Sequence, residues 1–139
     1  MFKIKKIILL IIVCFFVYIE WCPASFGDVC ENKVVNINKE DNSNEITIDV
    51  GDILQIQLER FGSTGYEWYL DECYRNYFEL ISEDTEEISR KGFVGTPVLE
   101  TWKFRAIKKG ETDISLHLYR AWEGKSKSVD MFAIKVKIL

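Results

Sequence analysis

Apolar and polar residues alternate with a period of two along most of the chain after residue 30, and this pattern restricts the possible folds. Such a segment forms a β-strand with one buried face and one wet face, whereas a helix needs a period near 3.6. The alternating segments lie at residues 46–50, 54–58, 68–70, 78–81, 102–106, 114–118 and 132–138. Two packed antiparallel sheets need strands of this kind, because each sheet buries only one face. The sequence therefore predicts an all-β fold, an Ig-like antiparallel β-sandwich of about seven to eight strands.

The N-terminal segment has the pattern of a secretory signal peptide. Three lysines precede an unbroken apolar run at residues 7–19, which is too short to span a bilayer as a helix. Small residues follow, so we expect residues 1–27 to be a signal peptide, cleaved after Ala24 or Gly27, and residues 28–139 to be the mature domain. The alternative is an uncleaved N-terminal anchor. In either case the mature part enters the secretory pathway and is secreted or reaches an endosomal or lysosomal compartment.

The charge and the composition argue against several classes of function. Loss of three lysines and one glutamate with the signal peptide takes the formal net charge from −4 to −6. An acidic domain does not fit nucleic acid or an anionic membrane as a partner. His117 is the only histidine, and neither a Cys-x-x-Cys motif nor a paired-carboxylate arrangement is present. We therefore expect no enzyme activity, no small-molecule substrate, and neither a metal nor a cofactor.

The cysteines divide between the signal peptide and the mature domain. Cys14 and Cys22 leave with the signal peptide, and Cys30 and Cys73 remain. An even pair in an oxidising compartment predicts a Cys30–Cys73 disulfide, which would stabilise the domain by about 4 kcal/mol. The alternative is that Cys73 is a catalytic thiol with His117 as its base. This alternative is the weaker one, because His117 lies in an alternating strand segment and is expected to point outward.

Three segments interrupt the alternation, and loops on a rigid sandwich are where binding residues gather. They are residues 60–66, the long polar stretch 82–98, and residues 120–128. The acidic run within the second segment is expected to be a solvated face. Trp122 is expected in the third loop, since a turn signal follows it, whereas Trp68 and Trp102 lie in alternating segments and are expected in the core.

These interruptions resemble the chagasin family of cysteine-protease inhibitors over roughly residues 34–139. The family has a loop reading Asn-Pro-Thr-Thr-Gly, then an aromatic residue and a Trp. This chain has Phe61-Gly62-Ser63-Thr64-Gly65-Tyr66 and Trp68 there. A family Gly-rich loop matches Gly92-Phe93-Val94-Gly95-Thr96, and a family Arg-Pro-Trp matches Arg120-Ala121-Trp122. The chain departs from the family at Phe61-Gly62 and at Ala121, where flexible residues replace a stiff proline.

The resemblance implies a reversible inhibitor that places three loops, as a wedge, in the cleft of a papain-like protease without a covalent bond. We expect the domain to be a monomer. The protease-binding residues that the resemblance implies are Gly62, Ser63, Thr64, Gly65, Tyr66, Gly92, Phe93, Val94, Gly95, Arg120, Ala121 and Trp122. A Gly-Ser-Thr-Gly tip suits this role, because it is narrow and buries no charge. An exposed Trp beside an Arg has the composition of an interface hot spot.

The alternative of a different class is a secreted Ig-like adhesion or ligand-binding module, because this fold hosts many functions. The loop motifs discriminate between the two. An adhesion module has no reason to combine Ser-Thr-Gly-Tyr-x-Trp with Arg-x-Trp.

Overall fold

The computed structural model describes residues 31–88 and 97–139, and all of the elements below belong to the compact unit Asn32–Leu139. The expected signal peptide, Cys30 and the Gly-rich segment 92–95 lie outside the described residues. Within the described ranges, no helix is long and apolar enough to cross a membrane. In the same ranges, no cluster of His, Cys, Asp or Glu is suited to hold a metal ion.

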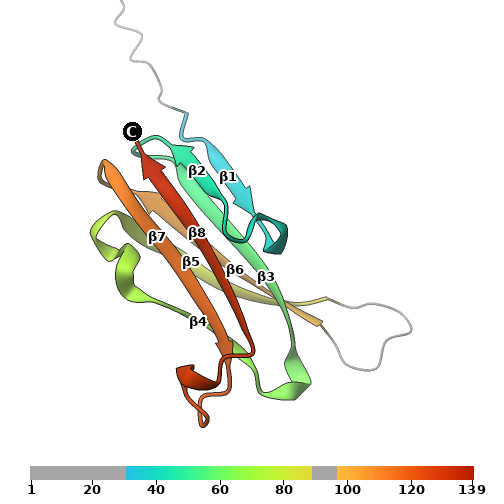
Figure 1. Ribbon diagram of the computed structural model, residues 1–139. Helices are drawn as coiled ribbons and strands as arrows, with labels where there is room; N and C mark the ends of the chain where they lie inside the picture. The colour runs from blue at the N-terminus through green and yellow to red at the C-terminus, as the bar shows by residue number, and fades with distance from the viewer. Residues whose placement is uncertain (1–30, 89–96) are drawn as a thin grey trace, which may run out of the picture. The chain divides into compact units, whose positions relative to one another are not determined.

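Eight strands form two four-stranded sheets packed face to face (Figure 1). One sheet has the order β1-β3-β6-β5 and the other β2-β8-β7-β4. The strands are β1 (Val34–Ile37), β2 (Glu45–Ile48), β3 (Ile53–Phe61), β4 (Glu67–Leu70), β5 (Phe78–Glu87), β6 (Pro97–Ala106), β7 (Gly110–Tyr119) and β8 (Asp130–Ile138). Four short 3₁₀ turns connect them: η1 (Lys39–Asp41), η2 (Gly62–Thr64), η3 (Glu72–Asn76) and η4 (Lys125–Lys127). The prediction of an all-β, Ig-like sandwich is confirmed.

The strand directions depart from the expectation at one edge of each sheet. The pairs β3–β6, β5–β6, β4–β7 and β7–β8 are antiparallel, but β1 pairs with β3 and β2 pairs with β8 in parallel. Both parallel strands are four residues long and lie at a sheet edge. β1 and β2 are consecutive in the chain and are connected by η1, and each of them joins a different sheet. The alternation of a single strand does not contain this information, because it is the same for both directions of pairing.

The core lies between the inward faces of the two sheets. Leu54, Ile56 and Leu58 of β3 and Trp102 and Phe104 of β6 are at most 1% exposed, as the period of two requires. From the other sheet come Ile114, Leu116, Phe132, Ile134 and Val136, equally buried. Trp68 is also buried, so both tryptophans expected in the core lie there. Truncation of such an aromatic residue to alanine typically lowers the free energy of unfolding by about 3–5 kcal/mol. This well-packed layer supports the loops.

The strand predicted at residues 78–81 is too short, and the loop predicted at 82–98 is correspondingly too long. β5 continues through the acidic run to Glu87 and stays paired with β6, with Glu87 opposite Val98. Every residue in the outer half of β5, 83–87, is exposed, so no apolar alternation marks it. Backbone pairing with β6 defines this half, and a sequence pattern based on burial cannot detect it.

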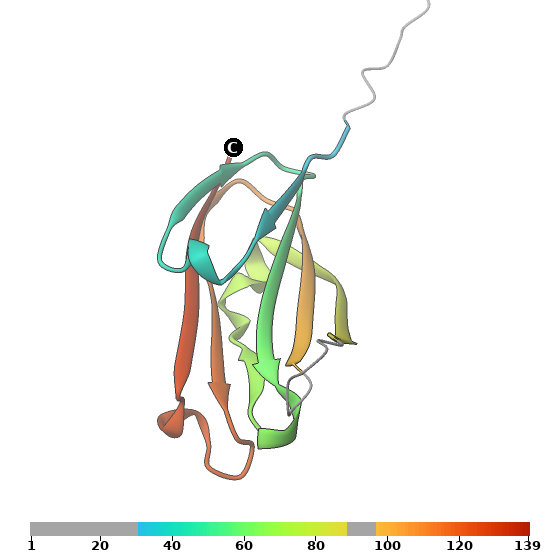
Figure 2. The same cartoon turned by 90° about the vertical axis from the view of Figure 1, so that its right-hand side faces the viewer.

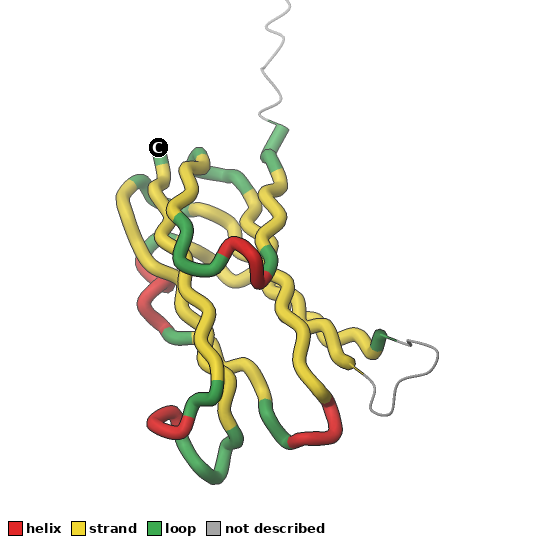
Figure 3. The backbone as a smooth tube through the Cα atoms, turned by 45° about the vertical axis from the view of Figure 1, so that its right-hand side comes forward, coloured by secondary structure: helices red, strands yellow, loops and turns green. Residues whose placement is uncertain are grey.

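One end of the sandwich holds two of the segments that were expected to carry function, residues 60–66 and 120–128, together with the strand ends that flank the third. β3 and β5 end there, β6 begins there beside Phe61, and β7 ends where β4 begins. Figure 2 shows the β3–β4 connection and the β7–β8 connection side by side at this end. Figure 3 shows the 3₁₀ turns η2 and η4 at the same end.

Candidate functional site

The β3–β4 connection, residues 61–66, is a tight turn that we call the tip loop. Gly62–Thr64 forms one turn of 3₁₀ helix, and the Thr64 hydroxyl donates a hydrogen bond of 2.7 Å to the carbonyl oxygen of Phe61. Gly65 ends the turn in the left-handed conformation, with φ of 74°. A residue with a Cβ adopts this conformation only at a cost, so glycine is favoured here. The tip is therefore exposed, small-sided and fixed by its own hydrogen bond.

The β7–β8 connection, which we call the Trp122 loop (residues 120–128), is joined to the tip loop through Arg120. The Arg120 Nε atom donates a hydrogen bond of 3.1 Å to the carbonyl oxygen of Thr64. The guanidinium lies 4.4 Å from the centre of the Tyr66 ring and 5.7 Å from that of the Trp122 ring. Cation–π contacts of this kind contribute about 0.5–1 kcal/mol each at exposed sites. Arg120 therefore orders two loops at once, although the residues that it joins are 56 positions apart.

Trp122 lies in its loop as expected, and its side chain is 72% exposed. Its ring covers Gly65, because a Cβ built on Gly65 would lie only 2.7 Å from the Cη2 atom of the indole. Glycine at this position thus meets two requirements, a positive φ and a close approach by an aromatic ring. The result is one surface made of a small polar tip and a large exposed aromatic ring.

The base of the β5–β6 connection lies next to the tip loop. The Ile88 amide donates a hydrogen bond of 2.8 Å to the carbonyl oxygen of Pro97, which closes the β5–β6 hairpin at the last described residues. Pro97 is also the register partner of Phe61 on β3. Of the expected site residues, the structure brings together those of the tip loop and the Trp122 loop. Gly92, Phe93, Val94 and Gly95 lie outside the described residues.

A buried ion pair supports the tip loop from below. Arg60 of β3 pairs with Glu100 of β6, and both side chains are largely shielded from solvent. Burial raises the pKa of Glu100 above its usual value, while the hydrogen bond and charge of Arg60 and the backbone N–H of Trp68 oppose this rise. Trp68 belongs to the other sheet, and its indole N–H donates to the carbonyl oxygen of Glu59. These bonds tie β3 and β4 together across the two sheets where the tip loop starts and ends.

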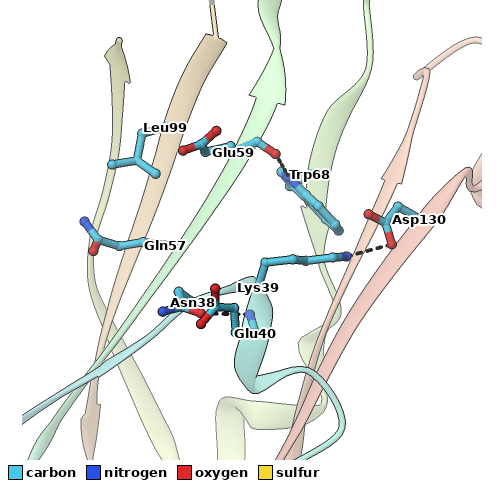
Figure 4. Close-up of a pocket in the computed structure, with 8 residues that line it drawn as sticks. All are labelled: Asn38, Lys39, Glu40, Gln57, Glu59, Trp68, Leu99 and Asp130. Atoms are coloured by element: carbon cyan, nitrogen blue, oxygen red, sulfur yellow. Dashed lines mark hydrogen bonds and ion pairs between the residues drawn. The ribbon is translucent and has the colours of Figure 1, made fainter.

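A hollow of about 430 Å³ lies beside this support (Figure 4). The ammonium of Lys39 lies 5.0 Å from the centre of the Trp68 ring and forms a salt bridge of 2.7 Å with Asp130. η1 thus packs against Trp68 and against the start of β8. This exposed ion pair joins η1 to the strand that follows the Trp122 loop.

A family comparison decides which class of protein this geometry belongs to. Residues 47–136 match the model of the family described as "Chagasin family peptidase inhibitor I42", and they make up more than half of the chain. The chain belongs to the chagasin family. Amoebiasin-2 of Entamoeba histolytica is 34% identical over 87 residues, which cover 61% of this chain and 68% of that protein.

Solved structures agree on the fold. The cysteine protease inhibitor EhICP2 from Entamoeba histolytica superposes with a TM-score of 0.72 at 24% identity, covering 78% of this chain and 98% of the other. The solution structure of Amebosin superposes with a TM-score of 0.56 at 25% identity, covering 77% of this chain and 98% of the other. The chagasin-like sandwich that the sequence predicted is thus the observed one.

The Trp122 loop has a second attachment that the chagasin-type motifs did not reveal. Lys125 donates to both carboxylate oxygens of Asp71, at 2.6 and 2.8 Å, and His117 lies 3.1 Å from the same carboxylate. Burial alone would raise the pKa of Asp71, but the bonds and charges of Lys125 and His117 outweigh it and lower this pKa. Lys125 and His117 are far from Asp71 in the sequence, so no local motif marks this cluster.

The thiol alternative gains no support from these contacts. Cys73 is exposed and forms no disulfide within the described residues, which do not include Cys30, and no hydrogen bond joins it to His117 there. His117 lies on the outer side of β7, as expected, but it is only partly exposed because Asp71 covers it.

Two apolar residues at this end were also not selected from the sequence. Phe61 was seen only as a departure from the family motif, yet it is 64% exposed at the start of the tip loop. Val129, just before β8, is 58% exposed. The signal that points to Phe61 is a large aromatic residue at the boundary between an alternating strand and a glycine-rich turn.

Proposed function

We propose that this chain is a secreted, reversible inhibitor of papain-like, cathepsin-type cysteine proteases, which fills the active-site cleft with three loops and catalyses no reaction. Membership of the chagasin family supports the class of target. The single observation that carries the mechanism is the contact between the tip loop and the Trp122 loop through Arg120, Gly65 and Trp122. Because this surface is ordered before binding, little conformational entropy is lost in the complex.

The shape of the tip explains how a cleft is blocked without cleavage of the inhibitor. A protease of this class cuts a peptide bond that is presented in a suitable conformation to its thiolate. The tip is instead a closed 3₁₀ turn, held by the bond from Thr64 to Phe61. Its backbone would have to unwind before a peptide bond could be attacked, and Arg120 opposes this by holding the Thr64 carbonyl oxygen.

The chemistry of the tip suits a cleft that contains a thiolate–imidazolium pair. Ser63 and Thr64 bring hydroxyl groups, and no charged residue lies within Gly62–Gly65. An uncharged tip avoids a large desolvation penalty on entering the cleft. Trp122 then contributes the apolar contact area, as buried aromatic residues do at interface hot spots.

The test is a titration of active papain and of a cathepsin L-type enzyme with the purified domain 28–139. We expect inhibition that is reversed by dilution, and an inhibitor that is recovered with unchanged mass after the complex is dissociated. No inhibition at micromolar concentration would reject the function. A cleaved or covalently modified inhibitor would reject the mechanism.

Secretion and the disulfide belong to the same proposal. Residues 1–27 would direct the chain to the secretory pathway and be removed, and Cys30 would then pair with the exposed Cys73 in an oxidising compartment. Alkylation of the denatured, non-reduced secreted protein should find no free thiol, and its N-terminal sequence should begin after Ala24 or Gly27. Two alkylated thiols would refute the disulfide. Size-exclusion chromatography with light scattering tests the proposed monomer.

A further inference from the structure

Phe61 presents an aromatic ring to solvent at the start of the tip loop. It follows the last inward residues of β3, and its side chain is 64% exposed. Its backbone is fixed on both sides, by the bond from the Thr64 hydroxyl to its carbonyl oxygen and by pairing with Pro97. A side chain held by a rigid backbone loses little conformational freedom when it is buried by a partner.

Phe61 lines an apolar hollow of about 360 Å³. It is lined mainly by Phe61, Thr64, Tyr66, Pro97, Leu118 and Val129. Val129 forms part of its rim and is 58% exposed. We call Phe61, Val129 and this hollow the Phe61 flank of the tip loop.

Three charged residues border the Phe61 flank. Arg60 is paired with Glu100, Asp130 is paired with Lys39, and the exposed Glu59 also takes part in an interaction. The one cation among them is already paired, so a partner that contacts this flank meets mainly apolar groups and no free cation. A carboxylate brought against it would lose water without gaining a cation in return.

The tip loop thus has an exposed aromatic side chain at each end of its turn, one from the loop itself and one from the Trp122 loop. Trp122 covers Gly65, and Phe61 begins the turn that Gly65 ends. Any cleft that accepts the tip must accommodate both rings. Trp122 matches a residue of the family motif, whereas Phe61 stands where that motif has a polar Asn, so the second ring is a property of this chain.

We propose that the Phe61 flank determines target preference: Phe61 packs into an apolar subsite beside the catalytic centre of the protease, and proteases with a carboxylate in that subsite are inhibited less well. This inference rests on the proposed inhibitory function. Burial of most of a Phe side chain corresponds to about a 10- to 50-fold gain in affinity. The same gain is absent where the subsite is charged.

The experiment uses a matched pair of proteases, one papain-like enzyme with an apolar subsite next to the catalytic cysteine and its variant with a single glutamate in that subsite. Inhibition constants are measured for wild type, Phe61→Asn and Phe61→Leu. We expect Phe61→Asn to weaken inhibition of the parent enzyme about 10- to 50-fold, and Phe61→Leu only a few-fold. The wild-type inhibitor should inhibit the glutamate variant of the protease less strongly than the parent enzyme. Against that variant, the inhibition constants of Phe61→Asn and wild type should be nearly the same.

The control is Ile107→Asn, which replaces another half-exposed apolar side chain at the opposite end of β6. It should leave both inhibition constants unchanged. Melting temperatures of the Phe61 variants should stay near wild type, because the ring lies outside the core. If wild type inhibits neither protease, the proposed function fails. If wild type inhibits but Phe61→Asn has no effect, or an equal effect on both enzymes, only the Phe61 inference fails. A wild-type dimer that Phe61→Asn converts to a monomer would also overturn it, since the flank would then bind a second copy.

Discussion

Replacement of Gly65 by alanine tests the central contact of the proposed site, because it adds a single methyl group between the tip loop and Trp122. The change has two separate effects. The first is backbone strain, since φ at Gly65 is 74° and a residue with a Cβ costs about 1 kcal/mol more than glycine in this region. The second is steric, since the new Cβ would lie 2.7 Å from Cη2 of Trp122, whereas carbon atoms prefer about 3.5–4.0 Å.

The two effects should be seen in different measurements. Trp122 is 72% exposed, so its ring can move away by roughly an ångström without disturbing the core. The loss of stability should therefore be close to the strain alone, about 1 kcal/mol, or a fall of about 4 °C in melting temperature. The displaced ring no longer matches the protease. A hot-spot Trp contributes about 2–4 kcal/mol, and loss of a large part of this would weaken inhibition by about 10- to 100-fold.

The chain offers a matched control at the other end of β3. Gly51 also has a positive φ, 97°, and a Cβ there would lie 3.0 Å from the side-chain oxygen of Asn32. Gly51→Ala should lower the melting temperature by a similar amount and leave the inhibition constant unchanged. Thermal melts and inhibition titrations of the two variants, side by side, separate strain from loss of the binding surface.

A double-mutant cycle with Trp122→Ala gives the decisive result. If the added methyl group acts through the indole, Gly65→Ala should cost less than about three-fold in inhibition once Trp122 is alanine. If the two losses instead multiply, the methyl group acts independently of Trp122 and the reasoning is refuted. An unchanged inhibition constant for Gly65→Ala alone would refute it as well.

Three further predictions concern the charges around the site. Thr64→Asp should weaken inhibition of every papain-like enzyme at least as much as Trp122→Ala, because it brings a carboxylate against a thiolate in a water-poor cleft. If the variant inhibits as well as wild type, the proposal that the tip enters the cleft is contradicted. Arg60→Met removes the cation that opposes the raised pKa of Glu100, so this pKa should rise further. The loss of stability should be about 3 kcal/mol near pH 7 and should shrink as the pH falls and Glu100 takes up a proton. Urea unfolding at several pH values checks this, and a loss independent of pH would contradict it. Asp71→Asn removes a carboxylate whose pKa is lowered in the folded state, so the variant should be less stable than wild type above about pH 4. The difference in stability should shrink as the pH falls through the folded pKa of Asp71. The opposite trend in the same assay would contradict a stabilising role for the Asp71 carboxylate.

The sequence was a good guide to the core and a poor guide to the exposed strands. Leu54, Ile56 and Leu58 are buried as their alternation predicts, because burial on one face selects the same residue types at every second position. β5 was cut short at residue 81, because its outer half is exposed and so carries no such selection. β1 was not identified as a separate strand, since it is four residues long and largely exposed.

The sequence by itself determined the sandwich, its inward faces, the positions of the tip loop and the Trp122 loop and, through the motifs around Thr64 and Arg120, the family. These properties depend on residues that are neighbours in the chain. Only the tertiary structure decided that Arg120 holds the Thr64 carbonyl oxygen, that Trp122 covers Gly65, and that Lys125 and His117 share Asp71. Each of these contacts joins residues about fifty positions apart, and strand register and sheet packing bring them together. No local pattern encodes such distances, because they depend on how the whole core packs.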